Sequence, residues 1–238
     1  MSIHRQIISY CTRNRVSTTE ASDAIGKTGV PFMVAPVNEG LYKVGRIKCV
    51  FTANNSNWDV HDQIRSASEG DIIIVFTYKC DENRAILGDL LSKYALLYRG
   101  AAAIIVQGAI RDVASVKRQR YAVWSQSVSP LGCHNHQTKP FPELERKRLL
   151  EMYDGGIAIC DDGGVTLIEN SLLNSTTLDR LKMIEMQEDI WFYCLDVLKW
   201  DTKRIVCSKD YLNADAENEF PRAMISIINQ LDHSRHVD

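Results

Sequence analysis

Two short apolar runs, at residues 71–76 (DIIIVF) and 101–106 (AAAIIV), constrain the fold of this chain more than any other feature. Continuous apolar runs of this length are typical of strands that are buried on both faces of a sheet. Between them, residues 86–98 carry apolar side chains at helical spacing. A strand, a helix and a second strand in this order form a crossover, which normally joins parallel strands. The sequence therefore predicts an α/β fold with a parallel sheet.

Other segments of the chain show weaker patterns of the same kinds. The sequence STTE at 17–20 has capping-box spacing and predicts the start of a helix. Further strands are predicted at 46–53, 121–124, 156–160 and 165–168. Further helices are predicted at 18–25, 60–67, 113–120, 141–153 and 177–199. The last ten or so residues are expected to lack regular structure.

The length and the charge of the chain limit its organisation and its partners. At 238 residues it is expected to form a single domain over 1–238, with a core at about 17–170. The C-terminal helix and tail, at about 171–238, are expected to pack on a neighbouring subunit. A formal net charge of −2 gives no overall field that would recruit nucleic acid or an anionic membrane. No apolar run approaches the roughly 20 residues that a membrane-spanning helix needs.

The cysteines and the N-terminal residues indicate a cellular compartment. Seven cysteines are scattered along the chain, odd in number and without paired spacing. This distribution is typical of reduced thiols rather than of a disulfide framework. The N-terminal 15 residues contain no continuous apolar segment and do not resemble a secretory signal. These features predict a cytoplasmic protein.

The sequence GAIRD, at 108–112, directly follows the second buried run. Ligands of open α/β sheets are usually held at the carboxyl ends of the strands, which is where this motif lies. Arg111 offers a bidentate clamp for a carboxylate, and Asp112 offers hard oxygen ligands for a cation. The structural alternative is an exposed Arg111 followed by an Asp112 whose side chain caps the next helix.

A second motif, GDLL at 88–91, opens the predicted helix of the crossover. Free N–H groups at the start of a helix bind carboxylates, and the helix dipole adds to this attraction. One strand–helix–strand unit therefore supplies an anion site at Leu90 and Leu91, and a cationic and metal-binding corner at Arg111 and Asp112.

Other candidate motifs are weaker or absent. The sequence contains no glycine-rich dinucleotide fingerprint, no P-loop, no HExxH and no GxSxG. The CHNH segment at 133–136 lacks the second ligand cluster that a structural zinc site requires, and we interpret it as a solvated loop. Asp161 and Asp162 lie in a predicted hairpin turn, where aspartate is favoured for backbone reasons.

The order GDLL, helix, RG, buried strand and GAIRD resembles the family of 4-hydroxy-4-methyl-2-oxoglutarate aldolases and the related regulator of ribonuclease E activity A, the RraA-like family. The similarity extends over about residues 17–170 in the same order. Three outlying pieces agree: Asn57-Trp58 with His61, Val123-Trp124-Ser125 with Ser129 and Gly132, and GGIAICDDGGVTLIE at 155–169. The resemblance implies a swivelling β/β/α domain that assembles as homotrimers or homohexamers, with active sites between subunits.

The resemblance also implies a reaction. The family's aldolases use a divalent metal cation, usually Mg²⁺, with Mn²⁺ as the alternative, and they release pyruvate from small 2-oxo acids by retro-aldol cleavage. Oxaloacetate decarboxylation is a common companion activity. At the matching positions, the substrate site would begin at Gly88, and the N–H groups of Leu90 and Leu91 would bind the carboxylate. Arg111 would bind the carboxylate and the 2-oxo oxygen, and Asp112 would ligate the metal.

Three departures from the family pattern affect the predicted site. The spacing from Asp89 to Arg111 is one residue longer than in the family, so the role implied for Asp89, beside the metal or orienting a water on it, is less well placed. The helical pattern at 141–153 replaces β-structure and could reshape one wall of the pocket. The family's base-like glutamate comes from a neighbouring subunit's C-terminal helix, where Glu188 and Glu185 are both candidates. A solvated helix face is the alternative for both glutamates.

The leading hypothesis is therefore a class II, metal-dependent pyruvate aldolase. The alternative is a non-catalytic regulator that binds a ribonuclease or a helicase, as related proteins of the family do. Those regulators lack the metal-binding aspartate, whereas this chain has Asp112. A third hypothesis is a decarboxylase or tautomerase that acts on another 2-oxo acid.

Overall fold

The computed structural model describes residues 1–213 and 218–235, and the chain divides into two compact units. The first unit is Met1–Thr177 and the second is Leu178–Asp238. The predicted packing of residues 171–238 on a neighbouring subunit stays a prediction.

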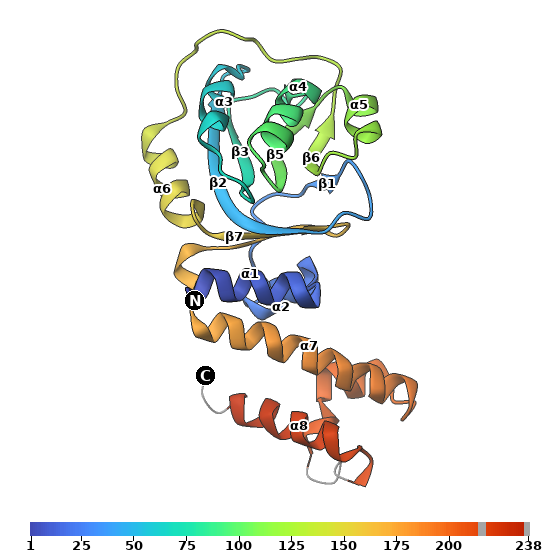
Figure 1. The fold of residues 1–238 in the computed structure, drawn as a ribbon. Helices are drawn as coiled ribbons and strands as arrows, with labels where there is room; N and C mark the ends of the chain where they lie inside the picture. The colour runs from blue at the N-terminus through green and yellow to red at the C-terminus, as the bar shows by residue number, and fades with distance from the viewer. Residues whose placement is uncertain (214–217, 236–238) are drawn as a thin grey trace. The chain divides into compact units, whose positions relative to one another are not determined.

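The elements follow one another along the chain as Figure 1 labels them. The strands are β1 (Ala35–Pro36), β2 (Lys43–Ala53), β3 (Ile72–Tyr78), β4 (Ala85–Leu87), β5 (Ala103–Ile110), β6 (Val123–Val128), β7 (Ile157–Asp161) and β8 (Gly164–Ile168). The helices of the first unit are α1 (Ile3–Asn14), α2 (Thr18–Ala24), α3 (Trp58–Gln63), α4 (Asp89–Lys93), α5 (Val113–Arg118) and α6 (Glu143–Tyr153), with short turns η1 (Ile64–Ser66), η2 (Tyr94–Tyr98) and η3 (Asn170–Leu172). The long α7 (Ser175–Asp196) begins in the first unit, and the second also contains η4 (Lys203–Ser208), η5 (Asp210–Leu212) and α8 (Arg222–Arg235).

The strands form one sheet in the order β1-β6-β5-β3-β2-β7-β8, and β4 pairs with β5. The strands β2, β3, β5 and β6 run parallel, with Ile74 opposite both Cys49 and Ile105. The predicted crossover between 71–76 and 101–106 therefore joins parallel strands. This confirms the α/β fold class, and α7 confirms the long helix in the C-terminal part.

Side chains of the central strands alternate between two faces of the sheet, and each face has its own core. Ile72, Ile74 and Phe76 pack with α6 and with the β7–β8 hairpin. Ile73 and Val75 pack with α3, α4 and α5, which lie together against the opposite face (Figure 1). The sheet is covered on both sides, which explains why the central parts of β3 and β5, at 72–76 and 103–106, are continuously apolar.

Strand β4 includes residues 86 and 87, which the sequence pattern predicts to be helical. The helix expected over 86–98 begins only at Asp89, because residues 85–87 form β4. The N–H of Ala85 donates to Leu131 O at 2.7 Å, and Leu87 O accepts from the N–H of Arg111 at 3.0 Å. Pairing on both sides makes this short apolar segment a strand, and Gly88 in an extended conformation separates it from the helix.

The ends of the chain contain helices that were not predicted. The segment of α1 shows no pattern that predicts a helix, yet its Ile7 and Cys11 are fully buried. The expectation of a C-terminal tail without regular structure is wrong up to Arg235, where α8 ends, and residues 236–238 lie outside the described part of the chain. No described helix is both long enough and apolar enough to cross a membrane.

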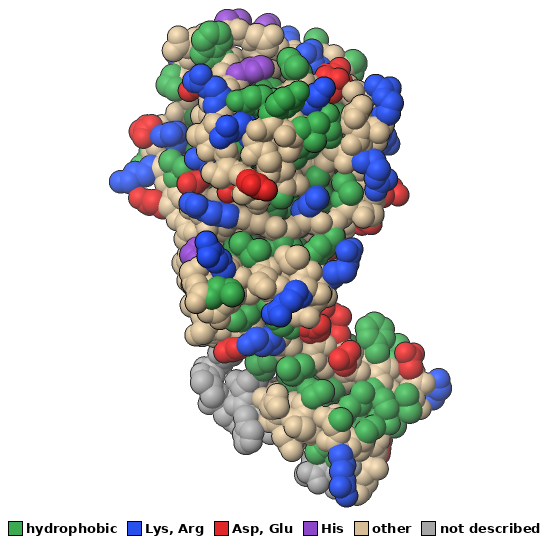
Figure 2. Space-filling model, viewed as in Figure 1, with side chains coloured by type: hydrophobic (Ala, Val, Ile, Leu, Met, Phe, Trp, Pro, Cys, Tyr) green, Lys and Arg blue, Asp and Glu red, His purple; other side chains and the backbone are tan. Residues whose placement is uncertain are grey.

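The second unit has its own core. Tyr211 is fully buried in it, and the Tyr211 hydroxyl accepts hydrogen bonds from Gln187 Nε2 at 2.8 Å and Trp191 Nε1 at 3.2 Å. Hydrophobic side chains also gather on the surface of this unit (Figure 2). They include Phe192 and Val197, which are 59% and 57% exposed.

Candidate functional site

The GAIRD motif lies where β5 ends and α5 begins. The N–H of Arg111 donates to Leu87 O of β4, so the position of Arg111 is fixed by the neighbouring strand. Asp112 has a φ of 57° and a ψ of 32°, in the left-handed region. Aspartate is one of the few residues other than glycine that tolerates this region, and the turn ends the strand abruptly.

The side chain of Asp112 faces the start of α4 rather than α5. Asp112 occupies the N-cap position of α5, but its side chain makes no capping hydrogen bond there. Instead, Asp112 Oδ2 accepts a long hydrogen bond of 3.3 Å from the N–H of Asp89. The same oxygen lies 3.6 Å from Arg111 Nε. The structural alternative, in which this carboxylate caps the next helix, is therefore wrong.

Two glycines make room for these side chains. A Cβ atom at Gly88 would overlap Asp112 Oδ2, and a Cβ atom at Gly132 would lie 2.5 Å from Arg111 Nη1. The side chains of Asp112 and Arg111 thus each lie directly against a glycine, and the two glycines come from different segments of the chain. Gly132 comes from the loop after β6, where Cys133 N–H donates to Ala85 O at 3.1 Å and so fixes the loop beside β4.

The GDLL motif occupies the first turn of α4, as predicted. Leu91 is buried and packs in the core beneath the helices, whereas Leu90 is 74% exposed. The N–H groups in the first turn of a helix have no acceptor inside that helix. The Asp89 N–H already binds Asp112, and those of Leu90 and Leu91 follow it in the same turn.

A hollow of about 250 Å³ lies beside the two charged side chains. It is lined by Arg111, Asp112, Val113, Val128, Ser129 and Pro130. The Arg111 and Asp112 side chains are 48% and 41% exposed, so both are accessible from this hollow. No local sequence pattern points to Val113, Val128 or Pro130, because only the parallel pairing of β5 with β6 brings their segments together.

The predicted glutamates belong to a different unit of the chain from the site at Arg111 and Asp112. Glu185 and Glu188 both lie on α7 in the second unit. A role for either glutamate in the site of a neighbouring copy stays a prediction. Among the described residues, no group of three or more His, Cys, Asp or Glu side chains is arranged to hold a metal ion.

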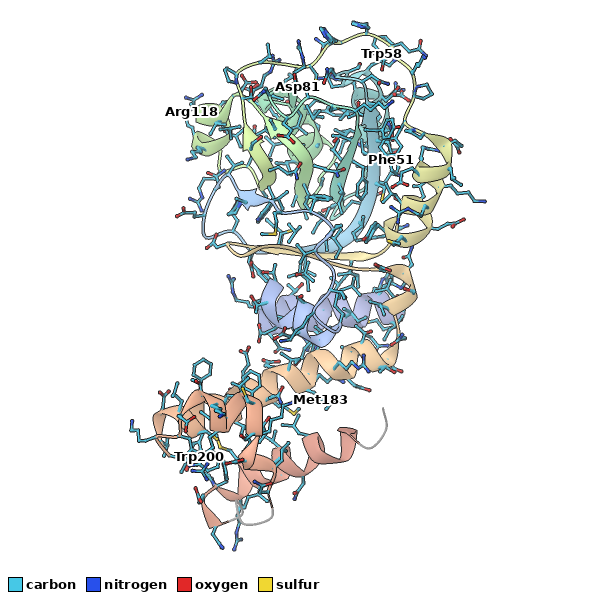
Figure 3. All side chains as sticks on the ribbon, turned by 180° about the vertical axis from the view of Figure 1, so that it is seen from behind. Phe51, Trp58, Asp81, Arg118, Met183 and Trp200 are labelled. Atoms are coloured by element: carbon cyan, nitrogen blue, oxygen red, sulfur yellow. The ribbon has the colours of Figure 1, made fainter. Side chains whose placement is uncertain are left out.

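A larger hollow, of about 580 Å³, lies over α3 and the loop after β6. It is lined by Trp58, Asp59, His61, Asp62, Arg65, Asn135 and Gln137, and Figure 3 labels Trp58 at this end of the molecule. Burial lowers the pKa of His61, and the guanidinium of Arg65 already pairs with Asp62. Because two carboxylates, Asp59 and Asp62, and a single guanidinium line this hollow, it is less suited to an anionic ligand than the site at Arg111.

Comparisons with known proteins match this arrangement to one family. A family model described as RraA-like, Aldolase/RraA, matches residues 18–166. A curated protein of Halalkalibacterium halodurans, provisionally named a 4-hydroxy-4-methyl-2-oxoglutarate aldolase, is 33% identical over 124 residues, which are 51% of this chain and 58% of that protein. The chain thus matches little more than half of the length of this relative.

Solved structures share the fold. An uncharacterized protein from Pseudomonas syringae pv. tomato superimposes with a TM-score of 0.63 at 18% identity, covering 82% of this chain and 91% of that one. Streptomyces coelicolor RraAS2, described as an unusual member of the RNase ES inhibitor RraA protein family, superimposes with a TM-score of 0.57 at 18% identity, covering 77% and 94%. At these identities the likeness concerns the fold alone.

Proposed function

Because this chain belongs to the RraA-like family, we propose that it is a divalent-metal-dependent lyase that cleaves small 2-oxo acids through a pyruvate enolate. One observation carries the proposal. The carboxylate of Asp112 lies against Gly88 and beside Arg111 at the end of a parallel strand, and it does not cap the helix that follows. A cation ligand and a carboxylate clamp thus border one hollow.

The donor set at this corner fits Mg²⁺, with Mn²⁺ as the alternative. The Asp112 carboxylate is half-exposed, and one long hydrogen bond leaves most of its acceptor capacity unused. Mg²⁺ is usually held by one or two carboxylates, with waters and substrate oxygens completing its shell. A divalent cation bound there would stabilise the negative charge that develops on the enolate oxygen.

The remaining residues of the proposed site bind the substrate and transfer protons. The guanidinium of Arg111 binds the substrate carboxylate and the 2-oxo oxygen. The N–H groups of Leu90 and Leu91 bind the same carboxylate from the start of α4. As the C3–C4 bond breaks, the 4-hydroxyl loses its proton, and C3 of the enolate gains one afterwards. We assign these transfers to a water that Asp89 orients and to Glu188 of a neighbouring copy, with Glu185 as the alternative.

An apolar stripe next to the site supports assembly as a homo-oligomer, a trimer or a hexamer. Leu90, Leu97 and Tyr98 are 74%, 61% and 69% exposed along one face of α4 and η2, and Tyr94 stacks on Tyr98. Contiguous exposed apolar side chains of this size usually mark an interaction surface. Because the stripe begins at Leu90, a neighbouring copy that covers it would also close the open side of the site.

The proposed compartment is the cytoplasm, and the proposed ligand is a small 2-oxo acid rather than a nucleic acid or a membrane. All seven cysteines are free thiols in the structure, which supports a reducing compartment. The relative from Halalkalibacterium halodurans carries an aldolase name, which supports retro-aldol cleavage as the main reaction. We propose oxaloacetate decarboxylation as a second reaction, because it passes through the same pyruvate enolate.

The second candidate function is a non-catalytic regulator. Streptomyces coelicolor RraAS2, whose fold is similar, is described as belonging to a family of RNase ES inhibitors. A regulator of this type needs a protein-binding surface, and the exposed stripe on α4 and η2 would also suit one. A regulator does not need the metal-binding arrangement of Asp112, which is why the lyase is the leading proposal.

Pyruvate release tests the lyase proposal. Chelator-treated protein is assayed with 4-hydroxy-4-methyl-2-oxoglutarate and with oxaloacetate, with and without Mg²⁺ or Mn²⁺, against matched samples without protein. We expect enzyme-dependent release only when the metal is present. Equal activity of the chelator-treated protein would contradict the metal role, and an absence of release from both substrates would favour the regulator.

A further inference from the structure

A second hollow adjoins the candidate site. It has a volume of about 280 Å³ and lies between α5 and the outer edge of the sheet. Two of its lining residues, Val113 and Val128, also line the hollow at Arg111 and Asp112. The two hollows therefore form one groove that runs from the Arg111–Asp112 corner along β6. Each alone falls below the roughly 300–1,000 Å³ of small-molecule sites, and the groove as a whole reaches that range.

The short strand β1 keeps this groove open. It pairs with β6 only through Ala35 and Pro36, which lie opposite Ser125 and Trp124. In the described part of the chain, β6 beyond Ser125 pairs with β5 on one side and has no paired strand on the other. The outer edge of β6 is thus free to form the floor of the groove next to α5.

The far end of the groove carries a positive charge. Lys117 lines the second hollow together with Gln126 and Ser127, and no acidic side chain among the residues that the structure describes lines it. Val113 and Lys117 are four residues apart on α5, so their side chains lie on the same face of that helix. The groove therefore has a guanidinium at one end, at Arg111, and an ammonium group at the other.

We propose that Lys117 binds a second carboxylate at the distal end of the substrate, so that the groove selects 2-oxo diacids over 2-oxo monoacids. This inference rests on the proposed function, because it takes Arg111 as the partner of the first carboxylate. Lys117 determines specificity and takes no part in bond cleavage. The guanidinium of Arg111 and the ammonium group of Lys117 border the two ends of the groove, and the apolar Val113 and Val128 line the part that the two hollows share. This arrangement suits a short dicarboxylate, whose two charged ends flank a carbon chain.

Binding of two ligands of equal chain length tests this inference. 2-Oxoglutarate and 2-oxopentanoate differ in the distal carboxylate, and neither has the 4-hydroxyl group that retro-aldol cleavage needs. Titration calorimetry with Mg²⁺ present should show that the protein binds 2-oxoglutarate about two- to fivefold more tightly, as expected for one exposed ion pair. Lys117→Ala should reduce this ratio to about one without changing the affinity for 2-oxopentanoate.

Arg118→Ala provides a control of equal charge. Arg118 lies next to Lys117 on α5 but lines neither hollow, and its side chain is exposed at the outside of the molecule (Figure 3). This variant should keep the preference of the wild-type protein for the diacid. An equal loss in both variants would indicate a general effect of charge and would overturn the proposal. So would an undiminished preference in Lys117→Ala, or a wild-type protein that binds neither ligand.

The assay of pyruvate release separates this inference from the proposed function. If the diacid preference depends on Lys117 and no pyruvate is released from 4-hydroxy-4-methyl-2-oxoglutarate, the groove is a diacid site and the lyase proposal fails. If pyruvate is released and Lys117→Ala leaves the KM for this substrate unchanged, the lyase stands and the role of Lys117 is overturned. We expect Lys117→Ala to raise the KM about two- to fivefold at nearly constant kcat.

Discussion

Asp112 follows the end of β5 and Asp161 is the last residue of β7 in the same sheet, but their carboxylates have different surroundings. The Asp161 carboxylate accepts hydrogen bonds from Thr18 N–H at 2.8 Å, Thr18 Oγ1 at 2.7 Å and Gly163 N–H at 2.8 Å. The Asp112 carboxylate accepts one hydrogen bond of 3.3 Å and lies 3.6 Å from Arg111. Asp161 therefore fastens α2 to the β7–β8 hairpin, whereas Asp112 keeps acceptor capacity for a ligand.

A structural aspartate and an aspartate that can bind a ligand differ in how many of their acceptor sites the chain itself fills. A carboxylate whose acceptor sites are filled by its own chain gains stability from those bonds and has little left for a cation. A carboxylate that is held by a left-handed turn and by contact with a glycine is positioned without using up its oxygens. Substitutions at the two aspartates should therefore affect different properties of the protein.

The largest expected effect is on turnover, in Asp112→Asn. Asparagine tolerates the left-handed conformation of residue 112, so the turn should keep its shape, but the amide is a poor ligand for a divalent cation. We expect kcat/KM for pyruvate release to fall about a thousandfold. The free energy of unfolding, measured in urea, should change by less than about 0.5 kcal/mol. A variant that is strongly destabilised but active per folded molecule would show that Asp112 is structural.

Gly88→Ala should lower activity about a hundredfold, because it displaces the Asp112 carboxylate. Gly88 has a φ of −134° and a ψ of −157°, an extended conformation that alanine adopts without strain. Its added Cβ would nevertheless overlap Asp112 Oδ2. Gly163→Ala is the matched substitution beside the other aspartate, where the Cβ would lie 2.9 Å from Thr18 Oγ1. Gly163→Ala should reduce the free energy of unfolding and leave activity unchanged. A loss of activity without a loss of stability would contradict the difference between the two aspartates.

Asp161→Ala should destabilise the fold by about 2–3 kcal/mol and leave kcat/KM per folded molecule unchanged. The N–H and the hydroxyl of Thr18 both donate partly buried hydrogen bonds to the Asp161 carboxylate. The substitution leaves both groups without this acceptor. Urea denaturation followed by circular dichroism measures the loss. If the fully folded variant instead lost its Mg²⁺-dependent activity, Asp161 would take part in the reaction, and the two aspartates would not differ in role.

Arg111→Lys should have the smallest of these effects, a rise in KM of about tenfold. Lysine keeps the positive charge, but it cannot reproduce the planar pair of donors that binds the substrate carboxylate and the 2-oxo oxygen together. Steady-state kinetics with 4-hydroxy-4-methyl-2-oxoglutarate measures the change. An unaltered KM would mean that Arg111 holds Asp112 in place and does not bind substrate.

The elements with long local patterns could be predicted from the sequence. The strands at 71–76 and 101–106 followed from continuous apolar runs, and the place of GAIRD at a strand end followed from them. β4 could not be predicted, because its three apolar residues fit a helix equally well. Its strand conformation depends on hydrogen bonds to Leu131 and Arg111, which lie far along the chain.

The site could be predicted only in part for a similar reason. Arg111 and Asp112 were identified by residue type and by their position after a strand. The contact of Gly132 with Arg111 joins a loop to the end of β5, and no local pattern reveals such a contact. The core of the second unit was missed because Trp200, Tyr211 and Phe220 come from short turns and loops without helical or strand periodicity.

Binding of Mn²⁺ in the presence of oxalate, a mimic of the pyruvate enolate, tests the central claim most directly. Titration calorimetry of the wild-type protein, Asp112→Asn and Asp161→Asn would compare the two aspartates in one assay. We expect Mn²⁺ to bind to the wild-type protein and to Asp161→Asn with similar affinity, and to bind to Asp112→Asn at least tenfold more weakly. Equal Mn²⁺ affinity in the wild-type protein and Asp112→Asn would contradict the account.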